Sequence, residues 1–320
     1  MTAPLAGTAL PARDEALLRL GRLLQARDYR FVTVTPATHA RVNARPENRM
    51  ARGLADVFGW SRPFRREVLD AEVFAALEAA DALEAHGDGW RSRVRWSSLD
   101  DGLLVHSRYP TDATDAVFFG PDTYRFVQAI DRHLEGVVPG SIRRAADIGC
   151  GAGPGALRVA RACPQAEVLA LDINPRALAL TRVNAALAGA ERLSARHSDL
   201  LKDVEGDFDL IVSNPPYLLD PGERAYRHGG GGLGLGLSLA IVDAALERLA
   251  PGGALLLYTG VAMVEGRDPF LGRLRQRLAD SPVNWHYREM DPDVFGEELL
   301  EPAYAGADRI AAVVLDLRRA

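Results

Sequence analysis

The sequence has little lysine, little cysteine and no long apolar run. Lysine occurs once, at Lys202, so arginine carries nearly all of the positive charge; its guanidinium stays protonated and binds phosphate or carboxylate in a bidentate manner. Two cysteines, Cys150 and Cys163, are too few for a disulfide framework. No segment approaches the roughly 18 apolar residues of a membrane span. The first basic residue, Arg13, follows a mildly apolar start, which does not suit a signal peptide. We therefore expect a cytoplasmic protein without membrane contact.

The charge is distributed unevenly along the chain. The 320 residues include 38 basic and 43 acidic side chains, a formal net charge of -5, which is unlike a protein that coats nucleic acid. Residues 1–110 hold 16 arginines and 14 acidic residues, so the excess of acid belongs to the remainder. Any basic surface must therefore lie in the first third.

Short apolar runs alternate with helical patterns from about residue 145 onward. We expect strands at 145–148, 168–171, 193–197, 208–212, 254–258 and 310–317, and helices at 156–162, 175–187, 238–249 and 269–278. Apolar strands separated by amphipathic helices are typical of a parallel sheet covered on both faces. The pattern predicts a doubly wound, Rossmann-like α/β domain.

The first third has a different pattern. Helical stretches at 15–26 and 67–85 precede strand-like segments at 90–96 and 103–106, and Asp100, Asp101 and Gly102 between these segments predict a hairpin. We infer a smaller α+β domain at residues 1–110 and an α/β domain at 111–320, which residues 115–134 enter as a strand and a helix.

A glycine-rich loop, residues 147–155, follows the first predicted strand of the α/β domain. Its glycines permit a tight turn that brings backbone close to a ligand at a helix N-terminus. Gly151, Gly153 and Ala156 also have the spacing of a dinucleotide site, and a simple strand-to-helix turn has similar glycines. The loop alone does not decide among these three interpretations.

Aspartates mark the ends of consecutive predicted strands. Asp172 comes 19 residues after Gly153, the separation at which a carboxylate reaches ribose hydroxyls. Asp199 ends the following strand, where it would accept a hydrogen bond from an adenine amino group. Asp147 precedes the turn and would repel a pyrophosphate, so the set favours a cationic adenosine ligand. Taken singly, Asp172 also suits a helix cap and Asp199 a solvated turn.

The residues Asn214, Pro215, Pro216 and Tyr217 follow another predicted strand. Two prolines remove two backbone donors and stiffen the loop, so the carbonyl groups face a ligand. The amide oxygen of Asn214 and the carbonyl of Pro215 would accept both hydrogens of a planar amino group, and the ring of Tyr217 would stack on its face. The same residues also suit a rigid turn without a ligand.

Together these features resemble the class I S-adenosylmethionine-dependent methyltransferases that carry an Asn-Pro-Pro-Tyr motif. The resemblance covers roughly residues 118–317 and implies a seven-stranded, mostly parallel sheet, S-adenosylmethionine as cofactor, S-adenosylhomocysteine as product, and no metal. In that family the motif holds a protein glutamine, an adenine or a guanine amino group. Alignment and carbonyl dipoles would supply most of the catalysis. The implied catalytic residues are Asn214, Pro215, Pro216 and Tyr217, and the implied cofactor-binding residues are Thr123, Asp147, Gly149, Cys150, Gly151, Gly153, Asp172, Ile173, Asn174, Asp199, Leu200 and Asn214.

Residues 118–124 look like the Arg-Pro-Asp/Glu-Thr-Glu element of the glutamine N5-methyltransferases that act on release factors. Pro121, Asp122 and Thr123 match, whereas Gly120 and Tyr124 replace the charged ends. Asp122 or Thr123 would also suit the cap of a helix that starts here. The element points to a protein glutamine as acceptor, and the two replacements leave a nucleobase open.

Two further segments have open roles. The loop with Arg227, His228 and glycines at 229–236 would either close over the site or simply connect a strand to a helix, and His228 is a weaker candidate for a base. Residues 41–66 contain seven arginines against two acidic residues. They would grip phosphates of RNA or DNA, hold an acidic protein, or form a solvated face. Arg91, Arg93 and Arg95 alternate as on one face of a strand.

The sequence thus predicts an N-methyltransferase with a macromolecular acceptor, a protein glutamine first and an amino group of RNA or DNA second. The alternative from another class is a module that binds S-adenosylmethionine or RNA without catalysis. The intact acceptor motif disfavours that module, because a protein without catalysis has no need to keep Asn214, Pro215, Pro216 and Tyr217 together. The oligomeric state is left open.

Overall fold

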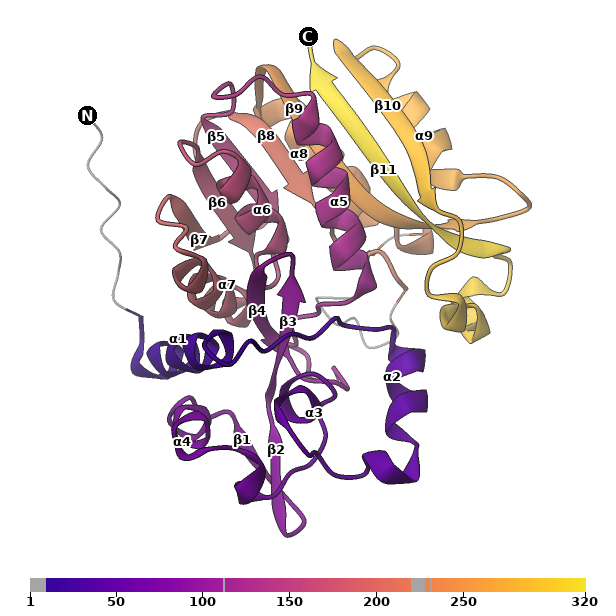
Figure 1. The fold of residues 1–320 in the computed structure, drawn as a ribbon. Coiled ribbons are helices and arrows are strands. Elements are labelled where there is room, and N and C mark those ends of the chain that lie inside the picture. Colours follow the sequence, from indigo (N-terminus) through magenta and orange to yellow (C-terminus); the bar gives the residue numbers. More distant parts are fainter. Residues whose placement is uncertain (1–9, 112, 220–227, 231) are drawn as a thin grey trace.

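The chain forms a large α/β part and a smaller part built from the first third of the sequence (Figure 1). The computed structural model describes residues 10–111, 113–219, 228–230 and 232–320. No helix within these ranges has both the length and the apolar character that crossing a membrane requires.

The α/β part is built on a seven-stranded sheet with the strand order β10-β11-β9-β8-β5-β6-β7. Strands β5 to β9 are mutually parallel, and β11 runs antiparallel to both β9 and β10. The predicted Rossmann-like, mostly parallel sheet of seven strands is therefore confirmed. The strands are β5 (Arg144–Ile148), β6 (Glu167–Asp172), β7 (Leu193–His197), β8 (Phe208–Ser213), β9 (Leu249–Met263), β10 (Val283–Asp291) and β11 (Arg309–Arg319).

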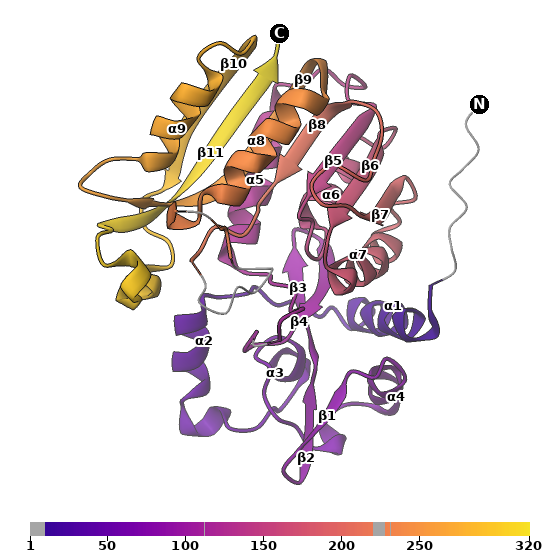
Figure 2. The ribbon, with the colours of Figure 1, turned by 180° about the vertical axis from the view of Figure 1, so that it is seen from behind.

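Helices cover the sheet on both faces. The helices α5 (Pro121–Glu135) and α6 (Pro154–Ala162) pack on one face, as Figure 1 shows, and α7 (Pro175–Ala188) lies beside them. The helices α8 (Gly236–Arg248) and α9 (Pro269–Leu278) pack on the other face, which Figure 2 shows from behind. Each face thus has its own apolar core, as the near-continuous apolar strands require.

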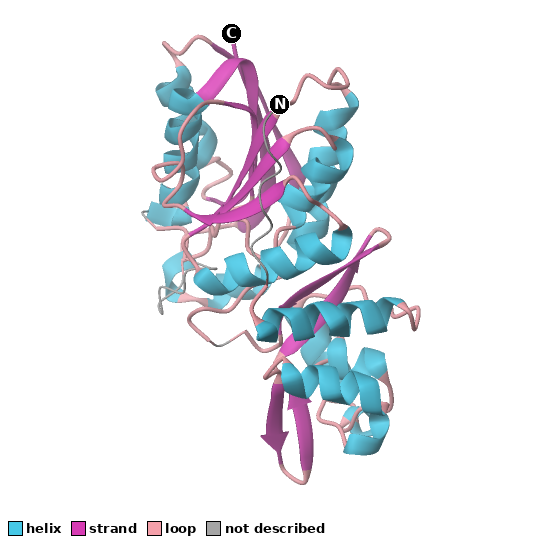
Figure 3. Cartoon of the chain, turned by 90° about the vertical axis from the view of Figure 1, so that its left-hand side faces the viewer, coloured by secondary structure: helices cyan, strands magenta, loops and turns pink. Residues whose placement is uncertain are grey.

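The smaller part lies below the α/β part in Figure 3 and consists of short helices with two separate two-stranded sheets. The predicted hairpin at Asp100–Gly102 is confirmed, with Leu99 opposite Gly102. The elements are α1 (Ala12–Gln25), α2 (Pro36–Asn43), α3 (Leu54–Phe58), α4 (Ala71–Ala79), β1 (Leu83–His86), β2 (Gly89–Ser92), β3 (Val94–Leu99) and β4 (Gly102–Ser107).

Buried polar contacts attach the smaller part to the α/β part. The Asn184 side chain of α7 is 1% exposed. Its Oδ1 accepts from the Val105 N–H of β4, and its Nδ2 donates to the carbonyls of Val105 and of Ala152 in the glycine loop. The Thr33 N–H donates to the Tyr124 hydroxyl of α5 over 3.0 Å. Tyr124, which replaces a glutamate of the family element, therefore joins the two parts.

Three expectations for the first 135 residues were wrong. The helix expected over 67–85 ends at Ala79, since Asp81 takes a left-handed φ of 49°, and β1 follows. The strand expected over 90–96 is split, because the Ser92 hydroxyl bonds both the carbonyl and the N–H of Val94 and turns the chain between two sheets. Residues 115–120 join no sheet; only the helix expected there, α5, forms.

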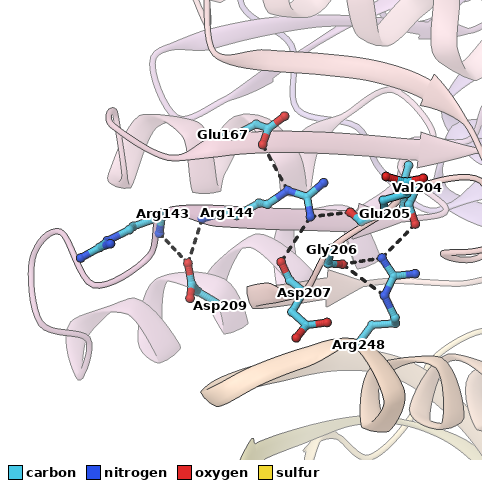
Figure 4. A network of polar contacts seen from close by, with 9 residues as sticks. All are labelled: Arg143, Arg144, Glu167, Val204, Glu205, Gly206, Asp207, Asp209 and Arg248. Carbon is cyan, nitrogen blue, oxygen red and sulfur yellow. Dashed lines mark hydrogen bonds and ion pairs between the residues drawn. The ribbon is translucent and has the colours of Figure 1, made fainter. Parts of the chain in front are cut away.

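Hydrogen bonds made by arginines connect the amino ends of the central strands (Figure 4). Asp209 accepts from the N–H groups of Arg143 and Arg144, which ties β8 to β5. The Arg144 guanidinium donates to Glu167 of β6 and to the carbonyl of Glu205. This network fixes the strands at the ends where they begin, which leaves their carboxyl ends for the site described next.

Candidate active site

A cavity of about 390 Å³ opens at the carboxyl ends of the parallel strands. Ligand sites of open α/β sheets lie at this edge, and small-molecule sites typically measure about 300–1,000 Å³. All of the predicted site residues except Gly153 line it: Thr123, Asp147, Gly149, Cys150, Gly151, Asp172, Ile173, Asn174, Asp199, Leu200, Asn214, Pro215, Pro216 and Tyr217.

Asp147 lies at the bottom of the glycine loop and is 2% exposed. Its Oδ2 accepts from the Ala156 N–H at the start of α6 over 2.8 Å. Burial raises the pKa of this carboxyl, the hydrogen bond from Ala156 lowers it and nearby Asp172 raises it, and together they bring it to about 7. A carboxyl that is partly protonated near neutral pH ionises more readily beside a cation.

The glycine loop bends through left-handed backbone. Gly149, Gly151 and Gly153 have φ angles of 70°, 55° and 83°, which L side chains adopt only with strain. Gly149 and Gly151 line the cavity. Gly153 instead precedes α6, where a Cβ would lie 2.9 Å from the Thr181 side chain. The structure gives Gly153 a packing role rather than a place in the cavity wall.

Asp172 at the end of β6 is oriented by two backbone donors. Its Oδ2 accepts from the Gly151 N–H and its Oδ1 from the Asn174 N–H, each over 2.9 Å. Asp172 does not cap α7, because the Asn174 side chain does so by accepting from the Arg176 N–H. The Nδ2 of Asn174 donates to the carbonyl of Asp115, so both polar atoms of Asn174 already have protein partners.

The loop after β7 brings Asp199 and Leu200 to the cavity. Asp199 is exposed and pairs with Lys202, the one lysine of the chain. Leu200 has a left-handed φ of 56°, which is uncommon for a residue with a side chain and often marks a functional site.

Asn214 follows β8 directly and offers an open acceptor. Its Oδ1 is buried and has no hydrogen-bond partner among the described residues. Buried polar atoms are nearly always paired, and an unpaired one costs about 1–3 kcal/mol. An amide oxygen left in this state on a cavity wall is suited to accept from an N–H of a ligand.

Tyr217 is held by a group that the sequence did not assign to it. Its hydroxyl donates to Oδ2 of Asp122, which is 3% exposed, and Tyr258 donates to Oδ1 over 3.0 Å. Arg125 reaches the same carboxylate over 3.2 Å. Burial raises the pKa of Asp122, against these three partners. A Cβ on Gly260 would overlap the Tyr217 ring, so the tyrosine is fixed from both ends.

Helix α5 begins as expected from Pro121, and its cap is local. Thr123 Oγ1 accepts from the Gly120 N–H over 3.2 Å. Thr123 is therefore the capping residue of the pair, whereas Asp122 points to Tyr217. Both residues line the cavity.

The segment between β10 and β11 also reaches the cavity, through Phe295, Glu297 and Glu298. Phe295 has a left-handed φ of 53°, and its ring contacts that of Tyr217 edge-on at 5.9 Å. These residues were not among those predicted from the sequence. They follow Asn214 by about 80 positions without a motif, so no local signal pointed to them.

The described residues that line the cavity carry charge of one sign. They include six carboxylates and no arginine, lysine or histidine. The acidic residues are Asp122, Asp147, Asp172, Asp199, Glu297 and Glu298. Such a wall attracts cationic ligands and repels phosphates.

The glycine run after the acceptor motif packs against that motif. A Cβ on Gly234 would overlap the carbonyl oxygen of Tyr217, and one on Gly229 would lie 2.7 Å from its Cα. The glycines thus allow close approach of two backbone segments. His228 pairs with Leu218 in a β-bridge and does not line the cavity. Arg227 lies outside the described residues.

The seven arginines of residues 41–66 divide into two groups. Arg62 pairs with Asp56, Arg65 pairs with Asp88, and Arg66 lies over the Phe74 ring. The second group, which we call the exposed arginine group, has no side-chain partner among the described residues; it consists of Arg41, Arg45, Arg49 and Arg52.

Arg91, Arg93 and Arg95 do not share an exposed face, contrary to expectation. Arg95 is 4% exposed and donates to the Gly59 carbonyl, whereas Arg93 is exposed. The break between β2 and β3 at Ser92 destroys the alternation. The aromatic residues Phe58, Phe64 and Trp96 are core.

Comparison with known proteins relates the α/β part to a family. The sequence model of the methyltransferase small domain matches residues 126–263, which include the glycine loop and the acceptor motif. These residues hold most of the cavity wall described above.

The chain is similar in sequence to proteins named release factor glutamine methyltransferase. The one from Deinococcus radiodurans is 44% identical over 125 residues, 36% of this chain and 44% of that protein. The one from Bordetella pertussis is 35% identical over 173 residues, 49% of this chain and 61% of that protein. The chain therefore spans about half the length of the curated relatives it matches. A solved M. jannaschii tRNA m1G37 methyltransferase aligns with a TM-score of 0.49 at 17% identity, over 71% of this chain and 57% of that chain.

Proposed function

We propose that this protein transfers a methyl group from S-adenosylmethionine to the side-chain amide nitrogen of a glutamine in another protein. The observation that carries the proposal is the buried Oδ1 of Asn214, which has no hydrogen-bond partner among the described residues, on the wall of an acidic cavity. The relatives named release factor glutamine methyltransferase support the same acceptor class.

The cavity fits an adenosine cofactor with a positive charge. Asp172 has both carboxylate oxygens oriented by backbone donors at the strand end where ribose hydroxyls bind in this fold class. Asp147 is buried at the glycine loop and gains a counter-charge from a cation. Asp199 and Leu200 form the far wall. When bound, S-adenosylmethionine supplies a sulfonium methyl group and leaves as S-adenosylhomocysteine.

The acceptor motif orients the nitrogen that is methylated. Asn214 Oδ1 and the Pro215 carbonyl accept the two hydrogens of a planar –NH₂ group, which fixes the plane of the acceptor. The prolines carry no N–H that would compete for these carbonyls. Asp122 holds Tyr217 through its hydroxyl, so the loop keeps its shape without a ligand. Alignment of this kind contributes several kcal/mol to catalysis.

The charge of the cavity favours an amide over a nucleobase. A nucleobase arrives with backbone phosphates on both sides, and every charged side chain among the described residues of the wall is a carboxylate. A glutamine side chain brings a neutral amide on a flexible stem. Like-charge contact costs several kcal/mol at an interface, so the wall discriminates against nucleic acid near the methylated nitrogen.

Residues 1–110 would recognise the acceptor protein at a distance from the cavity. Pro36 at the first turn of α2 lines the cavity, and Arg41 lies near the other end of this helix, about 8 Å away along its axis. Arg45, Arg49 and Arg52 continue the exposed arginine group beyond it. We expect this group to contact an acidic surface of the acceptor.

A second candidate is N-methylation of an adenine or guanine amino group in RNA or DNA. The exposed arginine group is the observation that favours it, because phosphates are a common partner of unpaired arginines. The acidic wall argues against it.

The two candidates differ in where label from the cofactor goes. Cell extract is incubated with the protein and S-adenosylmethionine labelled in its methyl group, then treated with ribonuclease, deoxyribonuclease or protease. We expect label that protease alone releases. Label released by a nuclease would replace the proposal with the second candidate, and label in neither fraction would indicate a binding module without catalysis.

A further inference from the structure

A second hollow, of about 320 Å³, lies on the face of the sheet that carries α5. It shares no residue with the cavity. Its wall uses α5 from Ala129 onward, whereas the cavity uses α5 up to Phe126. Thr123 and Arg132 are separated by about 14 Å along the helix. The hollow is therefore a separate site.

Strand alternation makes this surface basic. On β10, Trp285 and Tyr287 point to the face that packs with α9, and His286 and Arg288 point to the opposite face. On β11, Asp316 and Arg318 line the same hollow. Asp316 lies opposite His286 in the strand register. Beyond α5 no described helix covers β10 on this side, as Figure 1 shows.

Three arginines line the hollow: Arg132 of α5, Arg288 of β10 and Arg318 of β11. None of them forms an ion pair or side-chain hydrogen bond with a residue in the described ranges. The one carboxylate in the wall, Asp316, is bound to His133 Nδ1 over 2.7 Å. Burial lowers the pKa of Arg288 and so does nearby Arg132, whereas nearby Asp316 raises it. Arg288 therefore lies near a like charge as well as near Asp316.

The net charge of the side chains in the hollow favours an anionic ligand. The three arginines and Asp316 together contribute two positive charges to the hollow. A phosphate monoester or inorganic phosphate carries about two negative charges at pH 7. Guanidinium groups bind phosphate oxygens in bidentate fashion, and the ring of His286 adds a donor at the edge.

We propose that Arg132, Arg288 and Arg318 form a binding site for a phosphate group, separate from the methyl-transfer cavity. The phosphate belongs either to a small phosphorylated molecule or to the backbone of an RNA. The site does not depend on the proposed acceptor, because it shares no residue with the cavity.

The test is a titration of the intact protein with inorganic phosphate at constant ionic strength. The protein has seven histidines, and NMR signals of His133 and His286 are assigned with the variants H133Q and H286Q. We expect both signals to shift saturably with a midpoint in the millimolar range. The double variant Arg288→Ala, Arg318→Ala should lose the shift. The control Arg273→Ala, on α9 at the other face, should keep it.

Thermal unfolding checks that the double variant is folded. Phosphate should raise the Tm of the wild type and of R273A above the value in chloride of equal ionic strength, and it should not do so in the double variant. A short RNA without terminal phosphates distinguishes the sources: the same histidine shifts at micromolar RNA indicate a backbone phosphate, and none indicate a small ligand. No saturable shift with phosphate, or an equal shift in the double variant, would overturn the proposal. Shifts with poly-glutamate but not with phosphate would do so as well.

Discussion

The cavity and the exposed arginine group have opposite charge, although both are proposed to meet the same acceptor. Six carboxylates line the cavity and no described basic residue does, whereas Arg41, Arg45, Arg49 and Arg52 lie outside it without partners in the described chain. The difference in charge indicates that the two regions bind different parts of the reacting molecules. Carboxylates suit a cationic cofactor and a neutral acceptor nitrogen, and the arginines suit an anionic surface that need not approach the reacting atoms.

The largest effect is expected from Asn214→Ala in the cavity. Its Oδ1 has no hydrogen-bond partner in the described part of the chain, so the substitution should leave folding and cofactor affinity nearly unchanged. Turnover should fall on the order of 10²–10³-fold, as when one oriented hydrogen-bonding group is removed from a transition state. Steady-state kinetics together with calorimetry of cofactor binding measure both quantities.

The matched control is Asn284→Ala, an exposed asparagine on β10. It should turn over like the wild type. If N214A instead lost cofactor binding while turnover per bound cofactor was retained, the acceptor role of Asn214 would be wrong.

A smaller effect is expected from reversing the charge of three residues of the exposed arginine group. The triple variant Arg45→Glu, Arg49→Glu, Arg52→Glu should raise KM for the macromolecular acceptor on the order of tenfold, because it replaces attraction with repulsion. The dissociation constant of the cofactor should not change. Raising the salt concentration should reduce the difference between variant and wild type.

A charge-matched control reverses three exposed arginines elsewhere, Arg267, Arg273 and Arg275, near and within α9. This variant should keep the wild-type KM. Equal losses in both triple variants would mean that net charge, rather than the exposed arginine group, attracts the acceptor.

Cofactor affinity should depend on pH through Asp147. Its pKa is raised by burial to about 7, above about 3.9 in the unfolded chain. The group therefore stabilises the free protein fully below pH 4, and this contribution is lost as the pH rises through 7. A cationic ligand needs the ionised form, so affinity should rise about tenfold from pH 6 to pH 8.

The raised pKa of Asp172 acts in the same direction. The variant Asp147→Asn should bind the cofactor more weakly at pH 8 and show a much smaller pH dependence. An affinity that is flat between pH 6 and pH 8 in the wild type would contradict the role given to Asp147.

The smallest effect is expected from Lys202→Ala. Lys202 is exposed and pairs with Asp199 at the rim of the cavity, and exposed pairs of this kind contribute little. Cofactor affinity should change less than twofold. A loss of more than fivefold would show that the acidic wall depends on a basic residue, which would weaken the contrast between the two regions.

The sequence predicted the part of the site that is local in the chain. The glycine loop, Asp172, Asp199 and Asn214 each follow a strand directly, so a correct strand pattern places them at one edge of the sheet. Because these residues lie within short segments directly after the strands, short sequence motifs are enough to identify them. The predicted strands and helices of residues 145–317 form as expected, apart from β10, which the pattern did not show.

Contacts between distant residues were not predictable. Asp122 meets Tyr217 across 95 positions, and Asn184 meets Val105 across 79; neither pair leaves a periodic signal. Phe295 and Glu297 enter the cavity from a segment without a motif. In the first third, single residues determine where elements end. Ser92 divides one expected strand into two, and Asp81, with its left-handed backbone, follows a helix that ends earlier than expected.

The central claim is that the methyl group goes to a glutamine amide of a protein. The most direct measurement is mass spectrometry of acceptor protein isolated after reaction with methyl-labelled S-adenosylmethionine, digested completely to amino acids. We expect labelled N5-methylglutamine with the wild-type protein and none with N214A. Labelled methyladenosine or methylguanosine in the nucleic-acid fraction, with no labelled methylglutamine, would contradict it.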